Sequence, residues 1–278
     1  MFKIKKSFYK MVLAASAVLL LLVACTQSKV PPQETTVTVQ LKWVHLPQFA
    51  GFYMAQEKGY YANDNIKVTF LEAGPGINTA LNVTSGKADF GVLSPEDILM
   101  KRSQGESLTS LATIYRRSAV VFVAMANSGI VRPSDFIGKT LAIKYEQKDF
   151  DLRFYAMMKK LGLDIKKLKI VNFDPDYVAF YKGEVDVTAA YATAGLIKIR
   201  QKGLKPNPIW PSDYGIHFYS DTLATTDRLI AENPGLVSRF LRASLKGWQD
   251  AIEDYRQAVN VTMKYSQIKD QQLQTAMM

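Results

Sequence analysis

The chain has 278 residues, a formal net charge of +10, two histidines and one cysteine, Cys25. A single cysteine excludes an intramolecular disulfide, a cysteine-based metal cluster and a dithiol redox pair. The positive charge is not gathered into a basic stripe, so we expect no nucleic-acid partner. The length suits one large domain or two smaller ones.

The first 35 residues indicate export and anchoring. Four lysines precede an apolar run, Met11 to Ala24, that is too short for a comfortable membrane span. The run ends at Cys25 and resembles a bacterial lipoprotein signal, which is cleaved before the cysteine; the cysteine then carries fatty acids such as palmitate. We expect a signal peptide at 1–24, a lipidated tether at 25–35 and a protein anchored on the extracytoplasmic face of the cell membrane. The alternative is an ordinary signal peptide with an incidental cysteine.

The segment 41–61 and the residues just before it predict a strand, an aromatic loop and a helix. Val37, Val39 and Leu41 alternate with polar residues as in a half-buried strand. Pro47 suits the first turn of a helix, and Gly59 suits the left-handed position at its end. Aromatic residues at 49, 52 and 53 share one helical face, and such faces are more often core than ligand platform.

Three residues of this loop are candidate ligand contacts. Ligands of open α/β sheets bind at the carboxyl ends of strands, beside the N-termini of the helices that follow. Trp43, His45 and Gln48 occupy that position.

Two further strand–turn–helix units follow. The alternating strand 66–71 leads through Gly74 and Gly76 into a predicted helix of about ten residues. Backbone N–H groups of this turn suit an anion or a polar ligand edge, although such turns also occur for geometric reasons alone. The strand 89–93 leads into a helix that ends at Gly105. Ser94 is its N-cap or a ligand contact, and Glu96 lies in its first turn.

The rest of the chain alternates strands with helices, which predicts a largely parallel sheet. We expect strands at 108–114, 120–126, 140–143, 169–172, 186–191, 208–210 and 216–224. We expect helical segments at 133–136, 150–161, 177–182, 193–202 and 234–256. Apolar residues of the last helix predict a core-facing side: Leu236, Phe240, Leu241, Leu245, Trp248 and Ile252. Because the chain stops inside a predicted helix, we expect a further C-terminal segment.

Five segments, in this order, resemble substrate-binding lipoproteins of ABC importers, in the family named for thiamine-pyrimidine synthases and related to sulfonate and nitrate binders. They are LKWVHLPQFAGFYMAQEKGYY (41–61), EAGPGI (72–77), GVLSPEDILMKRSQG (91–105), SGIVRPSDFIGKTLAI (128–143) and NPGLVSRFLRASLKGW (233–248). The resemblance implies an α/β periplasmic-binding-protein type II fold, with two lobes, a two-strand hinge and a ligand cleft between them. Lobe I would comprise 36–117 and 218–278, and lobe II 118–217.

The resemblance also implies a ligand class. Family ligands with a flat heteroaromatic ring lie between aromatic side chains, which Trp43 and Tyr191 match. Polar ligand edges would meet Gln48, Gly74, Gly76, Ser94, Glu96 and Arg116, with Tyr145 and Glu146 or Asp174 in neighbouring loops. Pyrimidine-binding relatives carry a glutamate two or three residues beyond the second aromatic. In this chain those two positions are Thr193 and Ala194, so the glutamate is missing. A thiamine-precursor pyrimidine therefore competes with riboflavin and, less closely, with sulfonate or nitrate.

A pyrimidine-synthase-like enzyme and a surface adhesin or assembly protein are the alternative classes. Those enzymes use a histidine as substrate and cysteines near an iron site, whereas this chain has His45, His217 and Cys25. Neither an HExxH nor a GxSxG motif is present. A surface adhesin would leave the aromatic residues unexplained. We therefore expect a monomeric, non-catalytic receptor without metal or cofactor, with a small-molecule ligand and ABC permease subunits as partners.

Overall fold

The computed structural model describes residues 34–143, 145–146 and 149–278; the side chains of 144–150 are outside this description. Thr36–Met278 forms one compact unit. The predicted signal peptide, the lipidation site Cys25 and most of the tether lie outside the described residues. Within the described ranges, no helix combines the length and the apolar character needed to cross a membrane.

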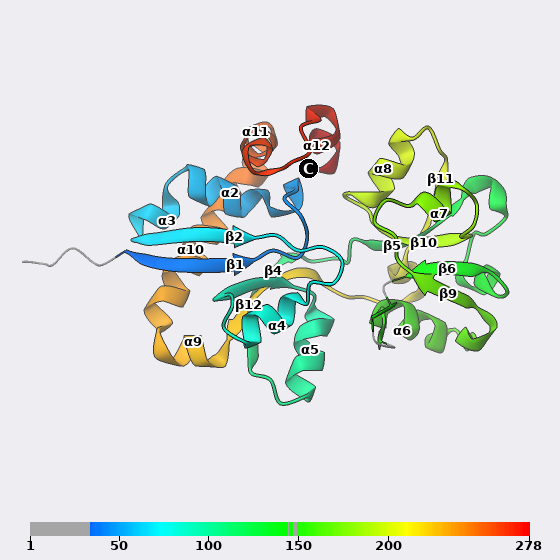
Figure 1. Ribbon diagram of the computed structural model, residues 1–278, viewed down its shortest axis with the longest axis horizontal. Helices are drawn as coiled ribbons and strands as arrows, with labels where there is room; N and C mark the ends of the chain where they lie inside the picture. The colour runs from blue at the N-terminus through cyan, green and yellow to red at the C-terminus, as the bar shows by residue number, and fades with distance from the viewer. Residues whose placement is uncertain (1–33, 144, 147–148) are drawn as a thin grey trace, which may run out of the picture. The chain divides into compact units, whose positions relative to one another are not determined.

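The first sheet has five strands in the order β2-β1-β3-β12-β4. Figure 1 labels β1, β2, β4 and β12 of this sheet. Their bounds are β1 Thr35–Gln40, β2 Ile66–Leu71, β3 Phe90–Leu93, β4 Leu108–Tyr115 and β12 Ser220–Thr226. Strand β1 runs parallel to β3, whereas β12 is antiparallel to both β3 and β4.

The second sheet has five strands in the order β11-β5-β10-β6-β9. Their bounds are β5 Val120–Met125, β6 Thr140–Ile143, β9 Lys169–Asn172, β10 Val187–Tyr191 and β11 Pro206–Ile209. Strands β10, β6 and β9 are parallel, and β5 is antiparallel to β10 and β11. A separate two-stranded ribbon pairs β7 (Tyr145–Glu146) with β8 (Asp149–Phe150).

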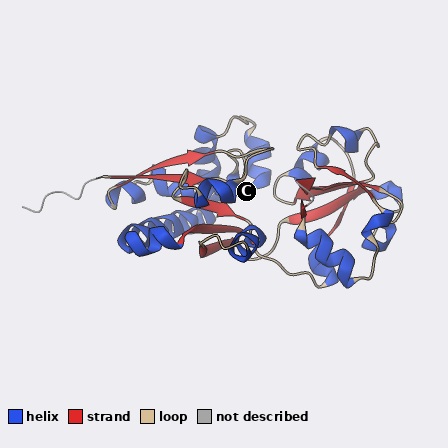
Figure 2. Cartoon of the chain, turned by 60° about the horizontal axis from the view of Figure 1, so that its bottom comes forward, coloured by secondary structure: helices blue, strands red, loops and turns tan. Residues whose placement is uncertain are grey.

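Each sheet is the centre of one lobe, and Figure 2 shows the two groups of strands flanked by helices. Lobe I carries η1 Pro47–Phe49, α2 Ala50–Glu57, α3 Tyr60–Asn63, α4 Thr79–Thr84, α5 Pro95–Ser103, α9 Asp227–Glu232, α10 Pro234–Glu253, α11 Tyr255–Tyr265 and α12 Gln271–Met277. Lobe II carries η2 Ala126–Ser128, η3 Pro133–Phe136, α6 Leu152–Lys160, η4 Ile165–Lys167, α7 Val178–Tyr181, α8 Gly195–Gln201 and η5 Pro211–Tyr214. The chain crosses between the sheets twice, before β5 and before β12. This two-lobed α/β architecture confirms the predicted fold class.

The prediction of a largely parallel sheet is wrong, because both sheets are mixed. The antiparallel strands include β5 and β12, each of which is the first strand after the chain has crossed from the other lobe. Strand β12 also begins at Ser220, later than predicted, because residues 216–219 form the connection between the lobes.

The aromatic face of α2 and its entry turn forms core. Phe49, Phe52 and Tyr53 are fully buried in the hydrophobic cluster of lobe I. The ring of Tyr53 stacks on that of Tyr265 at 4.4 Å, which ties α11 to α2. The prediction that this face is core is confirmed.

The predicted core face of α10 is only partly buried. Leu236 and Phe240 belong to the core, but Leu245 is 45% exposed and Ile252 is 75% exposed. Small residues on a neighbouring stripe, including Gly247, pack against α2 instead. A Cβ on Gly247 would lie 2.1 Å from the carbonyl oxygen of Gly51, so only glycine permits this approach of two helices.

Two predicted helices have different bounds in the structure. Helix α10 ends at Glu253, because Asp254 leaves helical geometry and accepts a hydrogen bond from the Gln257 N–H at 2.9 Å, which begins α11. The helix predicted from residue 77 is the six-residue α4, which starts after Asn78. The Asn78 side chain accepts from the Leu81 N–H at 2.9 Å and so caps α4.

Candidate functional site

Charged and polar side chains gather where the two lobes meet. We call this set the inter-lobe cluster: Lys42, Gln48, Glu96, Asp151, Arg153, Tyr191, Ser220 and Asp221. Lys42 follows strand β1, and Tyr191 is the last residue of strand β10. Both therefore lie at the carboxyl ends of parallel strands, where α/β sheets present ligand-binding groups.

Asp221 is the centre of the first half of the cluster. Its carboxylate accepts hydrogen bonds from Lys42 Nζ at 3.1 Å, from Gln48 Nε2 at 2.6 Å and from Tyr191 Oη at 2.6 Å. The Asp221 side chain is 1% exposed. Since Lys42 and Gln48 come from lobe I and Tyr191 from lobe II, this one carboxylate binds donors from both lobes.

The backbone at Asp221 is strained. Its φ is +20°, outside the regions that residues with a Cβ ordinarily occupy. Strain of this kind persists where surrounding contacts enforce it, and it is common at ligand-binding sites. The three hydrogen bonds to the carboxylate supply such contacts.

The pKa values of Lys42 and Tyr191 are both raised. Burial alone would lower the pKa of Lys42, but Tyr191 and Asp221 raise it above its ordinary value. Burial, and next the negative charge of Asp221, raise the pKa of Tyr191 to about 12. The Lys42 ammonium also lies 5.3 Å from the centroid of the Tyr191 ring.

Arg153 is the centre of the second half of the cluster. Its guanidinium contacts Glu96 Oε1 at 2.8 Å and Asp151 Oδ1 at 3.0 Å. Glu96 belongs to lobe I, whereas Arg153 and Asp151 begin α6 in lobe II, so this ion pair also joins the lobes. Burial raises the pKa of Glu96, and the charges of Arg153 and Lys42 offset this only in part. Burial acts on Asp151 in the same direction, but Arg153 outweighs it and holds the pKa of Asp151 below its ordinary value.

Two buried oxygens of this region accept no hydrogen bond from the described residues. They are Glu96 Oε2 and Thr193 Oγ1, the latter two residues beyond Tyr191. Buried polar atoms of native proteins are nearly always paired, so such atoms call for an explanation.

The structure brings three of the predicted site residues into the inter-lobe cluster: Gln48, Glu96 and Tyr191. Lys42, Arg153 and Asp221 belong to it too, although sequence reasoning missed them. Asp221 is the one ionised side chain within the predicted strand 216–224, which is a usable signal. Arg153 has no comparable signal, because basic residues are common on exposed helix faces.

Trp43, His45 and the glycine turn form a different group, within lobe I. The Trp43 carbonyl accepts from the Ala73 N–H at 3.2 Å, and the His45 N–H donates to Glu72 Oε1 at 2.7 Å. The His45 ring lies 2.8 Å from the Tyr53 hydroxyl and has a pKa lowered by burial. Trp43 packs partly against the core of lobe I, and no ring contact in the described part of the chain joins it to Tyr191.

The other predicted contacts differ in exposure and in hydrogen bonding. Gly76 is exposed and lies two residues before Asn78, whose side chain caps the first turn of α4. Ser94 precedes α5 as predicted, but its hydroxyl makes no capping hydrogen bond. Arg116 is exposed between β4 and β5. The side chains of Tyr145 and Glu146 lie outside the described residues.

Asp174, the alternative acceptor, is engaged by the backbone. Its carboxylate accepts from the Asp176 N–H at 2.9 Å and from the Val178 N–H at 2.6 Å, at the start of α7. Across the described ranges, histidine, cysteine and carboxylate side chains form no group of three that could hold a metal ion.

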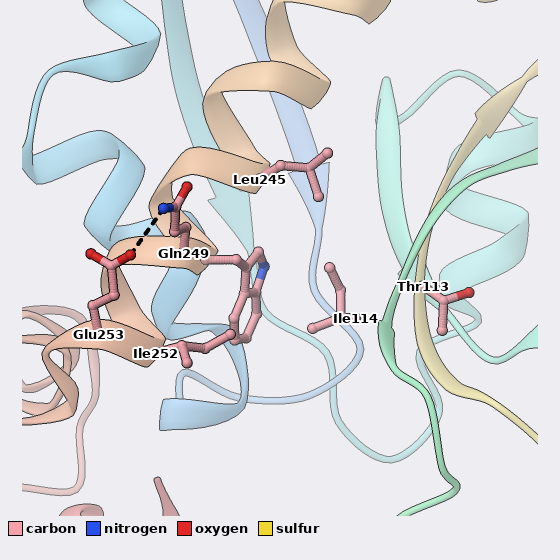
Figure 3. Close-up of a pocket in the computed structure, with 7 residues that line it drawn as sticks. Thr113, Ile114, Leu245, Gln249, Ile252 and Glu253 are labelled. Carbon is pink, nitrogen blue, oxygen red and sulfur yellow. Dashed lines mark hydrogen bonds between the residues drawn. The ribbon is translucent and has the colours of Figure 1, made fainter.

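A separate groove of about 390 Å³ lies between β4 and α10 (Figure 3). Its lining residues are Thr113, Ile114, Leu245, Trp248, Gln249, Ile252 and Glu253. Gln249 and Glu253 are hydrogen-bonded to each other at 2.9 Å. The groove contains no member of the inter-lobe cluster, and it accounts for the exposed leucine and isoleucine on the predicted core face of α10.

Comparison with known proteins supports the architecture. Among solved structures, the periplasmic aliphatic sulphonate binding protein SsuA from Escherichia coli superposes with a TM-score of 0.65 over 83% of this chain and 78% of its own. Its sequence identity is 14%, so this likeness concerns the fold alone.

Sequence relatives include binding proteins and synthases. The riboflavin-binding protein RibY of Chloroflexus aurantiacus is 29% identical over 87% of this chain and 71% of its own length. The formylaminopyrimidine-binding protein of Halalkalibacterium halodurans is 22% identical over 88% and 76%. A 4-amino-5-hydroxymethyl-2-methylpyrimidine phosphate synthase of Legionella pneumophila is 22% identical over 77% and 68%. Residues 46–258 match the NMT1/THI5-like family, and the chain therefore belongs to that family.

Proposed function

We propose that this protein is an extracytoplasmic receptor that binds a small heteroaromatic solute between its lobes and delivers it to an ABC permease. The observation that carries the proposal is the Asp221 carboxylate, which binds donors from both lobes in a buried, strained position. A solute bound at this point would contact both lobes at once, which is how two-lobed proteins couple ligand binding to closure.

The heteroaromatic character of the solute rests on Tyr191 and on the relatives. Tyr191 presents a ring at the junction of the lobes, and planar rings bind aromatic faces with favourable geometry. The names of two relatives specify riboflavin and formylaminopyrimidine. Pyrimidines and isoalloxazines are therefore the first ligands to test, and Trp43 remains the proposed second ring.

The remaining features of the receptor are proposals that follow from the sequence. Lipid on Cys25 would hold the protein at the membrane, with residues 25–35 as a tether. The lobe boundaries would be 36–117 with 218–278, and 118–217. We propose a monomer, since one chain supplies both lobes of the site.

The proposed role is non-catalytic, in contrast to the synthases among the relatives. His45, the better candidate of the two histidines, is engaged by Tyr53 and Glu72 within lobe I. The inter-lobe cluster holds its charges in ion pairs and hydrogen bonds, which suits recognition of a solute.

Calorimetric titration of the full chain in mild detergent tests the proposal. The compounds are riboflavin, formylaminopyrimidine, hydroxymethylpyrimidine, taurine and nitrate. Saturable one-to-one binding of a heteroaromatic compound is expected. Binding of taurine or nitrate alone would keep the fold assignment and contradict the heteroaromatic ligand.

A further inference from the structure

The two carboxylate oxygens of Glu96 have different surroundings. Oε1 pairs with Arg153 at 2.8 Å, whereas Oε2 is buried and accepts no hydrogen bond from the described residues. The whole residue is only 5% exposed. A buried carboxylate oxygen without a partner is costly, so it marks a position where another group is expected to bind.

Glu96 lies at the junction of the two lobes, where we place the solute. Glu96 lies in the first turn of α5 in lobe I, and its ion pair reaches Arg153 in lobe II. The two cations that act on its charge, Arg153 and Lys42, both belong to the inter-lobe cluster.

The charges of the cluster favour a hydrogen-bond donor over an anion. Lys42 is paired with Asp221, and Arg153 is paired with both Asp151 and Glu96. These groups therefore include three carboxylates and two cations, each cation already engaged. An oxyanion at this place would meet carboxylate repulsion, whereas an N–H group would form a charge-assisted hydrogen bond.

We propose that Glu96 Oε2 accepts a hydrogen bond from an N–H group of the bound solute, and that the solute is a nitrogen heterocycle with an N–H edge. This inference rests on the proposed function. The imide N–H of an isoalloxazine ring and the exocyclic amine of an aminopyrimidine are such donors. Sulfonate and nitrate oxygens only accept hydrogen bonds.

Matched ligand pairs test the inference. The full chain is titrated with riboflavin and N3-methylriboflavin, and with 4-amino-5-hydroxymethyl-2-methylpyrimidine and its 4-dimethylamino analogue. Each methylated compound keeps the ring and loses the N–H donor. We expect the wild type to bind the parent about 10- to 100-fold more tightly than the methylated partner, as for the loss of one hydrogen bond to a charged group.

The variant Glu96→Gln should reduce this discrimination to about threefold or less, because the charge that strengthens the bond is gone. The matched control, Asp97→Asn on the same helical turn, should keep the wild-type ratio. The wild-type comparison needs no variant, so it can overturn the inference even where Glu96→Gln folds poorly.

The possible results separate the two claims. Equal affinity of the wild type for parent and methylated ligands overturns the inference and leaves the receptor function standing. An equal loss of affinity for both ligands in Glu96→Gln also overturns it, because a purely structural role predicts that result. If neither parent compound binds, the proposed function fails and the inference fails with it.

Discussion

The ammonium of Lys42, which follows β1 in lobe I, lies 3.1 Å from the phenol oxygen of Tyr191, which ends β10 in lobe II. Both groups also contact the buried carboxylate of Asp221. The lobes therefore meet through a shared network of buried groups, in which each partner depends on the others.

A double-mutant cycle should reveal this dependence. Lys42→Met and Tyr191→Phe each remove one donor to Asp221, so we expect a coupling free energy of about 0.5–3 kcal/mol between them. Urea unfolding of the four proteins measures it. The control pair is Arg228 and Glu232 on α9, with side chains 69% and 61% exposed, where coupling should stay near 0.5 kcal/mol or below. Strict additivity at Lys42 and Tyr191 would contradict the network.

The contact of α10 with α2 depends on Gly247. In Gly247→Ala the new methyl group would lie 2.6 Å from the backbone nitrogen of Ala55 as well as against Gly51. Because backbone atoms cannot move aside cheaply, we expect a loss of about 1–3 kcal/mol in the free energy of unfolding, or more. In the matched control, Gly235→Ala on the same helix, the methyl group meets only the flexible Arg239 side chain at 3.4 Å. That variant should be neutral or slightly stabilised, and equal losses in both would contradict the packing argument.

The raised pKa of Glu96 predicts a pH dependence of stability. The folded state keeps the Glu96 proton to higher pH than the unfolded chain, because burial disfavours its charge. Unfolding therefore releases a proton in the window between the ordinary and the raised pKa, and the free energy of unfolding falls as pH rises through that window. Glu96→Gln removes this contribution.

Urea unfolding of both proteins across the acidic range measures the difference. The stability of the wild type relative to Glu96→Gln should decrease as pH rises. The lowered pKa of Asp151 gives the opposite slope, with stability lost as pH falls, but that carboxylate is present in both proteins. A relative stability that increases with pH would show that Arg153 dominates over burial at Glu96.

Trp43 tests the proposed aromatic contact in lobe I. If its ring stacks on the solute, Trp43→Ala should weaken binding of a heteroaromatic ligand by about 1–3 kcal/mol. Trp210, which packs against a hydrophobic cluster of lobe II, is the control, and Trp210→Ala should leave the affinity unchanged. Unchanged affinity in Trp43→Ala would remove this ring from the site.

Local sequence signals predict the elements of the fold, whereas the two-lobed arrangement follows from the resemblance to a known family. Alternating strands and terminal residues such as Pro47 and Gly59 identify elements without knowledge of their neighbours. The strands β5 and β12 are predicted, but their antiparallel direction is not, since strand direction depends on where the chain crosses between sheets.

The candidate site was predicted only in part. Gln48, Glu96 and Tyr191 stand at element ends, where position alone suggests a role. Arg153 joins them through an ion pair with a residue 57 positions earlier in the sequence, and such a pairing is a property of the folded chain.

Hydrogen exchange with and without riboflavin most directly tests the claim that the solute binds between the lobes. We expect added protection in both lobes at once, in the segments 41–49 and 188–195. Protection confined to one lobe, or to the groove between β4 and α10, would contradict it.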